Sequence, residues 1–175
     1  MNLKLIALGL ILFGILSRLI PHAPNIAAIG ALMLFSGAYL PKKMLWVPFI
    51  ALFISDYFIG FYGTDMFYVY GSYLLGLLIG WWLRSNKKPL LIIGGAFSSS
   101  ILFFLITNFG VWAPPNNWYP HTLGGLLQSY TLALPFFRNT LVSDLGYTVV
   151  LFGGYEILQI LVKKYLPAKV ASILV

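Results

Sequence analysis

The sequence predicts an all-α membrane protein with six transmembrane helices, cytoplasmic termini, and a re-entrant or interfacial helix between the fifth and sixth spans. Three observations predict it. Hydrophobic residues make up 60% of the chain and charged residues only 9%, whereas about a quarter of the residues in a soluble domain are charged. Apolar runs of about the 20 residues that cross a bilayer recur along the chain. Basic residues gather in turns on one side of these runs, as the positive-inside rule predicts.

The length and composition exclude several classes of protein. We expect residues 1–175 to form one integral domain in the inner (plasma) membrane, because 175 residues leave no room for a separate soluble domain. The chain has no cysteine, which excludes disulfides, thiolate metal sites and cysteine nucleophiles. The net charge of +7 does not indicate nucleic acid, because the basic residues lie beside apolar spans rather than along one stripe.

The first two predicted spans are Leu3–Ile20 and Ile26–Leu40. The first is an uncleaved span, because no small-x-small cleavage site follows Arg18. Two prolines then force an extended link. The second span is rich in small residues, and Ala27 and Ala31 lie on one face, where they allow close helix contact. Internal packing is the favoured interpretation, and docking of an external partner is the alternative.

The later spans are set by length and by the side on which lysines fall. Three of them cover Met44–Tyr62, Met66–Leu83 and Pro89–Ile106. The stretch Thr122–Val162 is long enough to cross twice, but two crossings would place Lys163 and Lys164 outside. We therefore interpret Thr122–Phe137 as a re-entrant or interfacial helix broken near Pro135, and Asn139–Val162 as the sixth span. A seventh span is the alternative.

The stretch Thr107–His121 is the longest break in the apolar pattern. It holds two of the five tryptophans and three of the ten prolines. Prolines at that density exclude helix, and Trp and Tyr suit a membrane–water boundary. We predict an ordered surface loop that covers the mouth of a binding site. A plain aromatic belt is the alternative.

Ionisable residues inside the spans are the strongest sign of function. A charge at the middle of a spanning helix costs about 2.5–3.5 kcal/mol, so such residues are paired, hydrated or functional. Helical rise places Asp56 and Asp144 in the outer half, where Arg18 and Arg138 also lie, so we predict an outward-facing polar pocket. Plain mutual neutralisation of these four residues is the alternative. Glu156 lies deeper and is expected to bond a neighbouring helix or to snorkel.

The predicted ligand site combines cations for anionic or carbonyl groups, carboxylates for donors, and aromatic rings that exclude water. Its residues are Arg18, His22, Asn25, Asp56, Asn108, Trp112, Trp118, Tyr119, His121, Arg138, Asn139 and Asp144. The two histidines and an aspartate match no known metal spacing, so no metal or cofactor is predicted. Motifs of known hydrolases and nucleotide-binding enzymes are absent, so the protein is not expected to be an enzyme.

Four stretches carry a resemblance to known proteins. They are Arg18–Asn25, Phe103–Trp112, Tyr119–Leu126 and Pro135–Thr140. Together they resemble a family of small bacterial membrane proteins of unassigned function. In layout the chain is also similar to the S components of energy-coupling factor transporters, which are six-helix subunits with a vitamin site near the outer face. That resemblance implies a transmembrane T component and two ATPases as partners.

The leading hypothesis is therefore a substrate-capturing membrane subunit that takes up a small polar or aromatic molecule, such as a vitamin or its precursor. The alternative is a structural or assembly subunit that binds a partner membrane protein through the aromatic loop. A membrane enzyme comes third, because no nucleophile–base pair is visible. The doublets Ser55–Asp56 and Ser143–Asp144 hint at a repeat, but their depths do not match an inverted pair.

Overall fold

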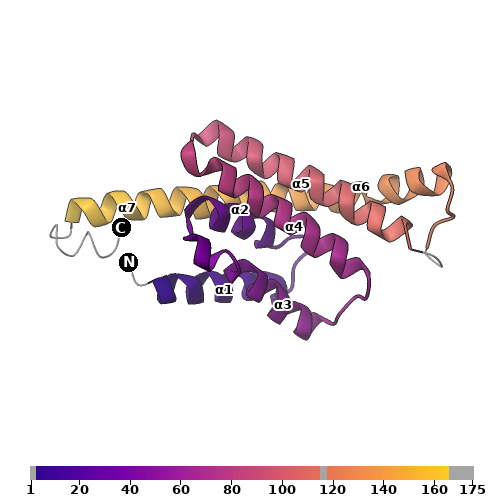
Figure 1. The fold of residues 1–175 in the computed structure, drawn as a ribbon, viewed down its shortest axis with the longest axis horizontal. Coiled ribbons are helices and arrows are strands. Elements are labelled where there is room, and N and C mark those ends of the chain that lie inside the picture. The colour runs from indigo at the N-terminus through magenta and orange to yellow at the C-terminus, as the bar shows by residue number, and fades with distance from the viewer. Residues whose placement is uncertain (1–2, 115–117, 166–175) are drawn as a thin grey trace.

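The computed structural model describes residues 3–114 and 118–165, and this part of the chain is all-α, without a strand. Six helical rods follow one another and alternate in direction (Figure 1). The helices are α1 Leu3–Leu19, α2 Ile29–Tyr39, α3 Val47–Ile59, α4 Asp65–Trp82, α5 Pro89–Trp112, α6 Leu123–Thr148 and α7 Gly154–Tyr165, with a π-helical turn, η3 Val149–Gly153, between the last two. Three rods in the described ranges are long and apolar enough to cross a membrane: Asp65–Ser85, Pro89–Trp112 and Leu123–Tyr165.

Helix α2 is the centre of the bundle, and ten of its 11 residues are buried. Glycines bring it close to α4. A Cβ atom on Gly37 would overlap the carbonyl oxygen of Leu77, and one on Gly80 would overlap that of Leu34. Such close contact between helices is what small residues allow inside membranes. Ala31 is also buried, so it serves internal packing. Ala27 lies in the non-helical segment before α2, so the prediction that it shares a helix face with Ala31 is wrong.

The short length of α2 creates space beside it. Its 11 residues span about 16 Å, roughly half of a hydrocarbon core of about 30 Å. The non-helical link 20–28 precedes it. This link contacts α6 at Asn139 and Ser143, which lie roughly 25–30 Å from the helix start at Leu123 by helical rise. Irregular backbone at such depth is tolerated where it is enclosed by protein or lines a cavity.

Helix α6 continues through η3 into α7 as one rod of 43 residues, Leu123–Tyr165, about 65 Å long. The predicted separate helix Thr122–Phe137, broken near Pro135, is wrong, because Pro135 lies inside α6. The residues before Pro135 pack along α5, and Tyr130 donates a hydrogen bond to the carbonyl of Leu105 (2.9 Å). Membrane helices tolerate such a proline where neighbouring groups support the freed backbone.

Helix α5 is longer than the sequence pattern indicates. The predicted span ends at Ile106, whereas α5 continues to Trp112. The first six residues of the stretch Thr107–His121 are therefore helical, and the prediction of a loop over its whole length is wrong. The reason is that the first proline of the stretch is Pro114, and a helix usually ends just before the residue that precedes a proline. Residues 115–117 lie outside the described ranges.

The basic residues gather at one end of the bundle, where α7 projects past the other helices (Figure 1, left). Tyr39 of α2 donates to Glu156 of α7 (2.5 Å), which confirms that Glu156 bonds a neighbouring helix. The turn between α2 and α3 carries Lys42 and Lys43, and the turn between α4 and α5 carries Arg84, Lys87 and Lys88. The last turn of α7 carries Lys163 and Lys164. That this end faces the cytoplasm stays a prediction from the positive-inside rule.

Candidate functional site

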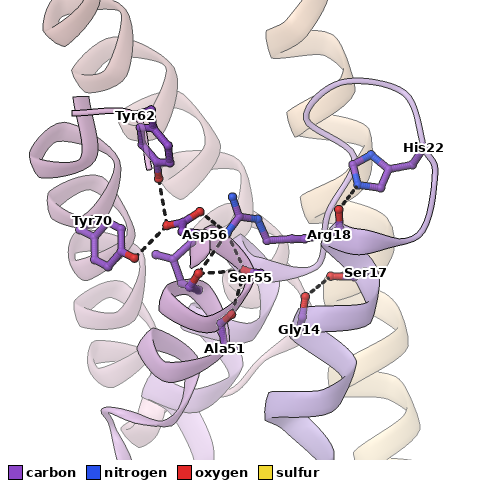
Figure 2. A network of polar contacts seen from close by, with 10 residues as sticks. Gly14, Ser17, Arg18, His22, Ala51, Ser55, Asp56, Tyr62 and Tyr70 are labelled. Carbon is purple, nitrogen blue, oxygen red and sulfur yellow. Dashed lines mark hydrogen bonds and ion pairs between the residues drawn. The ribbon is translucent and has the colours of Figure 1, made fainter. Parts of the chain in front are cut away.

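An ion pair joins the C-terminal turn of α1 to α3 (Figure 2). Nη1 of Arg18 lies 2.6 Å from Oδ1 of Asp56. The same nitrogen lies 2.6 Å from Oγ of Ser55 and 3.2 Å from the carbonyl oxygen of Leu52. The carboxylate is fully buried, and the arginine side chain is 17% exposed. A charge pair at this depth is stabilised only when both partners are well bonded, and these contacts meet that need.

Two tyrosines complete the surroundings of Asp56. Tyr70 of α4 donates to Oδ2 over 2.8 Å, and Tyr62 of the α3–α4 turn donates to the same oxygen over 3.2 Å (Figure 2). Burial raises the pKa of Tyr62, and the neighbouring Asp56 charge raises it further, so the phenol stays protonated and able to donate. Both carboxylate oxygens of Asp56 are therefore occupied. Arg18 and Asp56 form the neutralised pair that was one of the two interpretations of the sequence.

The link before α2 is held against α6. Asn139 donates to the carbonyl of Pro24 (3.0 Å) and Ser143 to that of Ala27 (2.9 Å). Asn25 has a φ of 63°, in the left-handed region that asparagine tolerates better than most residues. Asn139, predicted to bind ligand, thus positions the link. These bonds fix the non-helical backbone that borders the cavity described below.

His22 also belongs to this link. Its ring nitrogens lie 2.8 Å from the carbonyl oxygen of Ala23 and 3.2 Å from that of Arg18. Both contacts are local, so His22 stabilises the end of α1 where the arginine projects. The histidine is exposed, yet it also lines the cavity beside Arg18.

Asp144 of α6 is the second buried carboxylate, and it is 6% exposed. Ser100 of α5 donates to its Oδ2 over 2.7 Å. Gly30 of α2 lies against it, and a Cβ atom there would overlap the carboxylate. Position 30 must therefore stay free of a side chain for Asp144 to keep this place. Asp144 joins three helices, α2, α5 and α6.

Two adjoining cavities occupy the space beside the link. The first, which we call the polar cavity, is about 240 Å³, and its lining includes Arg18, His22, Asn25, Tyr62, Tyr73 and Asp144. The second, which we call the aromatic cavity, is about 220 Å³, and its lining includes Phe104, Asn108, Phe136 and Phe137. Asn25, Phe103 and Thr140 line both. Four of the predicted site residues thus meet at one cavity, Asn108 lines its neighbour, and Asp56 lies behind Arg18.

Arg138 lies apart from this group. Its side chain is exposed, and it lines neither cavity. Its neighbours in sequence, Phe137 and Thr140, do line them. Arg138 and Asp144 are six residues apart, which on a helix of 3.6 residues per turn places them on different faces. Similar depth in the membrane did not bring these two side chains together.

The described residues of the aromatic loop lie at the tip of the α5–α6 hairpin, at the end of the bundle opposite α7 (Figure 1, right). Trp112 donates to the carbonyl of Pro120 (3.0 Å), and its ring packs against His121. Trp118 is 90% exposed, and Tyr119 is partly exposed. None of these four aromatic residues lines the polar or the aromatic cavity. Phenylalanines of α5 and α6 form the apolar walls instead.

Sequence reasoning missed several residues that line the cavities or hold Asp144. They are Tyr62, Tyr73, Ser100, Phe103 and Thr140. Thr140 had a usable signal, because it precedes Asp144 by four residues and so shares its helix face. The tyrosines had none, because a tyrosine in an apolar span is equally typical of a lipid-facing position.

Comparisons with known proteins give a family without an activity. No curated protein and no solved structure matches the chain. The matching family is described as a family of unknown function, DUF6580, and its model covers residues 2–168. This match spans nearly the whole chain, including every helix described above. The chain therefore belongs to the DUF6580 family.

Proposed function

We propose that the protein is a substrate-capturing membrane subunit that holds a small molecule in the polar cavity. One observation carries the proposal: ionisable and hydrogen-bonding side chains line an internal space within a bundle otherwise built from apolar helices. Such groups are expensive inside a membrane, and they commonly mark a substrate or ion site. Together the two adjoining cavities, about 240 and 220 Å³, approach the size of typical ligand pockets, about 300–1,000 Å³.

The residues divide the work of binding. Arg18 uses Nη1 for Asp56, Ser55 and Leu52. Its guanidinium also lines the cavity, where it can bond a carbonyl or anionic group of the ligand. Asn25 and Thr140 supply neutral hydrogen bonds. The phenylalanines of the aromatic cavity accept an apolar or aromatic part and exclude water.

The proposal extends to the partners. The layout resembles S components, so a transmembrane T component and two ATPases are the proposed route by which captured substrate enters the cell. α7 has no buried residue and carries Lys163 and Lys164 in its last turn. It projects from the basic end (Figure 1), which we expect to face the cytoplasm, so it offers these partners a surface on the side where ATPases lie.

The test is to fill the polar cavity and measure ligand binding. Val69 lines that cavity, whereas Val142 of α6 is 63% exposed and lines neither cavity. Purified wild-type protein, Val69→Trp and Val142→Trp are screened for thermal stabilisation against a panel of vitamins, precursors, amino acids and amines. We expect hits with the wild type and Val142→Trp, and loss of the same hits with Val69→Trp. Absence of any hit with the wild type, or hits that survive Val69→Trp, contradicts the proposal.

One observation favours the assembly subunit as a second candidate. Trp118 is 90% exposed at the tip of the α5–α6 hairpin, which is unusual for so large a ring. Trp112 holds the loop together, so Trp118→Ala alone removes the surface without disturbing the fold. Loss of a defined, stoichiometric membrane partner on Trp118→Ala, with binding unchanged by Val69→Trp, supports this candidate over capture.

A further inference from the structure

The charge balance of the polar cavity points to the chemistry of its ligand. Asp144 and Arg18 both line the cavity, but Arg18 is paired with Asp56. Among the described side chains, no lysine, arginine or histidine lies within 4.0 Å of Asp144, since the one ion pair found there joins Arg18 and Asp56. Arg18 and Asp56 neutralise each other, so Asp144 in its ionised form has no counter-charge from this pair.

The Asp144 carboxylate is largely shielded from bulk solvent, and it borders the cavity. Asp144 is 6% exposed, and Ser100 is its one hydrogen-bond donor among the described residues, acting on Oδ2. A carboxylate can accept about four hydrogen bonds. Oδ1, which faces Gly30, receives no hydrogen bond in the described part of the chain. A buried carboxylate with so few partners is costly unless a positive charge approaches it.

The walls of the cavity favour an organic cation over a metal ion. Tyr62, Tyr73 and Phe103 contribute rings to the lining, and aromatic faces attract ammonium groups. The described residues contain no group of three or more His, Asp or Glu side chains that could hold a metal ion. A cavity of about 240 Å³ is also far larger than a bare ion needs.

We propose, resting on the capture function above, that the ligand carries a protonated nitrogen which pairs with Asp144, and an apolar or aromatic body which lies against Tyr73 and Phe103. The carboxylate selects the charge, while the rings select the body. Gly30 contributes by leaving room for the carboxylate, and Ser100 orients it through Oδ2. Asp144 is thus a specificity-determining residue, whereas Asp56 keeps Arg18 in place.

The experiment compares two probes that differ mainly in charge. 2-Phenylethylamine is protonated at neutral pH, and 2-phenylethanol has a similar shape without a charge. Affinity is measured by thermal shift and calorimetry on purified wild type, Asp144→Asn, and Glu156→Gln as a matched acid-to-amide control at the opposite end of the bundle. We expect the amine to bind the wild type at least about tenfold more tightly than the alcohol. Asp144→Asn should lose at least about tenfold in amine affinity, and Glu156→Gln should lose none.

Different failures have different meanings. Equal affinity for amine and alcohol, or an amine affinity unchanged by Asp144→Asn, overturns the cation assignment and leaves the capture function standing. Stabilisation of the wild type by sodium chloride but not choline chloride, lost in Asp144→Asn, assigns the site to an inorganic ion and also overturns it. If 2-phenylethylamine does not bind while an uncharged member of the wider panel does, the assignment of a ligand with a protonated nitrogen is wrong. If nothing binds, the capture function itself fails.

Discussion

The doublets Ser55–Asp56 and Ser143–Asp144 have the same sequence and opposite surroundings. Asp56 is fully buried, and it is met by one arginine and two tyrosines. Asp144 is almost as deeply buried, yet among the described residues one serine is its only hydrogen-bond donor, and the carboxylate borders a cavity. The first carboxylate has a counter-charge within the protein, in the guanidinium of Arg18, whereas no described residue supplies one to the second. The comparison teaches that a buried acid indicates a ligand site when the protein leaves its charge uncompensated.

The serines of the two doublets differ in the same way. Ser55 accepts a hydrogen bond from Arg18 and so belongs to the ion-pair network. Ser143 donates away from its aspartate, to the carbonyl of Ala27 in the link. Both residues of the Ser55–Asp56 doublet therefore contact the same arginine. In the Ser143–Asp144 doublet, the serine instead holds the non-helical backbone that borders the cavity. Four predictions test this difference, and they follow in order of expected effect.

Asp56→Asn is expected to have the largest effect. It leaves the Arg18 guanidinium without its counter-charge, and breaking a buried pair costs about 3–5 kcal/mol of stability. Thermal unfolding in detergent measures the loss. The double variant Arg18→Met with Asp56→Leu should recover much of the stability, because it removes both charges. A double variant as unstable as Asp56→Asn would show that the pair has another role.

Gly30→Ala should destabilise the protein by about 2 kcal/mol, because the new methyl group overlaps the Asp144 carboxylate and overpacking has this order of cost. Gly94→Ala on α5 is the matched control. Nothing lies within 4 Å of a Cβ at position 94, so alanine there should be neutral or stabilising. Equal melting temperatures for the two variants would contradict the close packing of Gly30 and Asp144.

Tyr70→Phe removes a 2.8 Å hydrogen bond to Asp56, and Tyr62→Phe removes one of 3.2 Å. Bonds to a charged acceptor contribute about 1.5 kcal/mol or more. We expect about that loss for Tyr70→Phe and a smaller loss for Tyr62→Phe, because the longer bond is weaker. Chemical denaturation of the two variants in parallel gives the ranking. A larger loss of stability for Tyr62→Phe than for Tyr70→Phe would show that the stronger hydrogen bond to Asp56 comes from the α3–α4 turn.

Asp144→Asn should change stability least and with the opposite sign. It removes a buried charge that no described residue neutralises. Without ligand, the free energy of unfolding should therefore stay the same or increase by about 1 kcal/mol, and the melting temperature should stay the same or rise with it. The same thermal assay as for Asp56→Asn makes the two directly comparable. A loss similar to that of Asp56→Asn would show that Asp144 has a structural partner, and the contrast between the doublets would disappear.

The sequence predicted the positions of the helices better than the directions in which their side chains point. Each of the six predicted spans overlaps a helical rod in the described part of the chain, and three of these rods are long and apolar enough to cross a membrane. Apolar runs of this length have few alternatives in a membrane. Helical rise also predicted the depth of Arg18 and Asp56 correctly enough to place them together. Rise does not tell which way a side chain points around the helix, however. Arg138 shares the depth of the cavity and still faces outward, since its direction is set by neighbours that the sequence alone does not identify.

The errors at helix ends have one physical origin. Proline was given too much weight at position 135, where membrane packing supports a helix through it. The predicted fifth span also ended too early, because Pro114 and Pro115 were taken to exclude helix from Thr107 onward. A proline restricts the backbone only near its own position. The tryptophans were expected to cover the site, but the loop that carries them bonds to itself through Trp112 and His121. Local hydrogen bonds of that kind cannot be predicted from amino-acid composition.

The brevity of α2 has a consequence for how the protein is made. A segment of about 16 Å is too short to cross the hydrocarbon layer alone, and a mismatch of this size costs free energy for every ångström left uncovered. During synthesis α2 therefore has no settled position until α4 supplies the surface that receives its glycines. The most buried helix of the finished bundle thus depends for its final place on a helix that is synthesised after it.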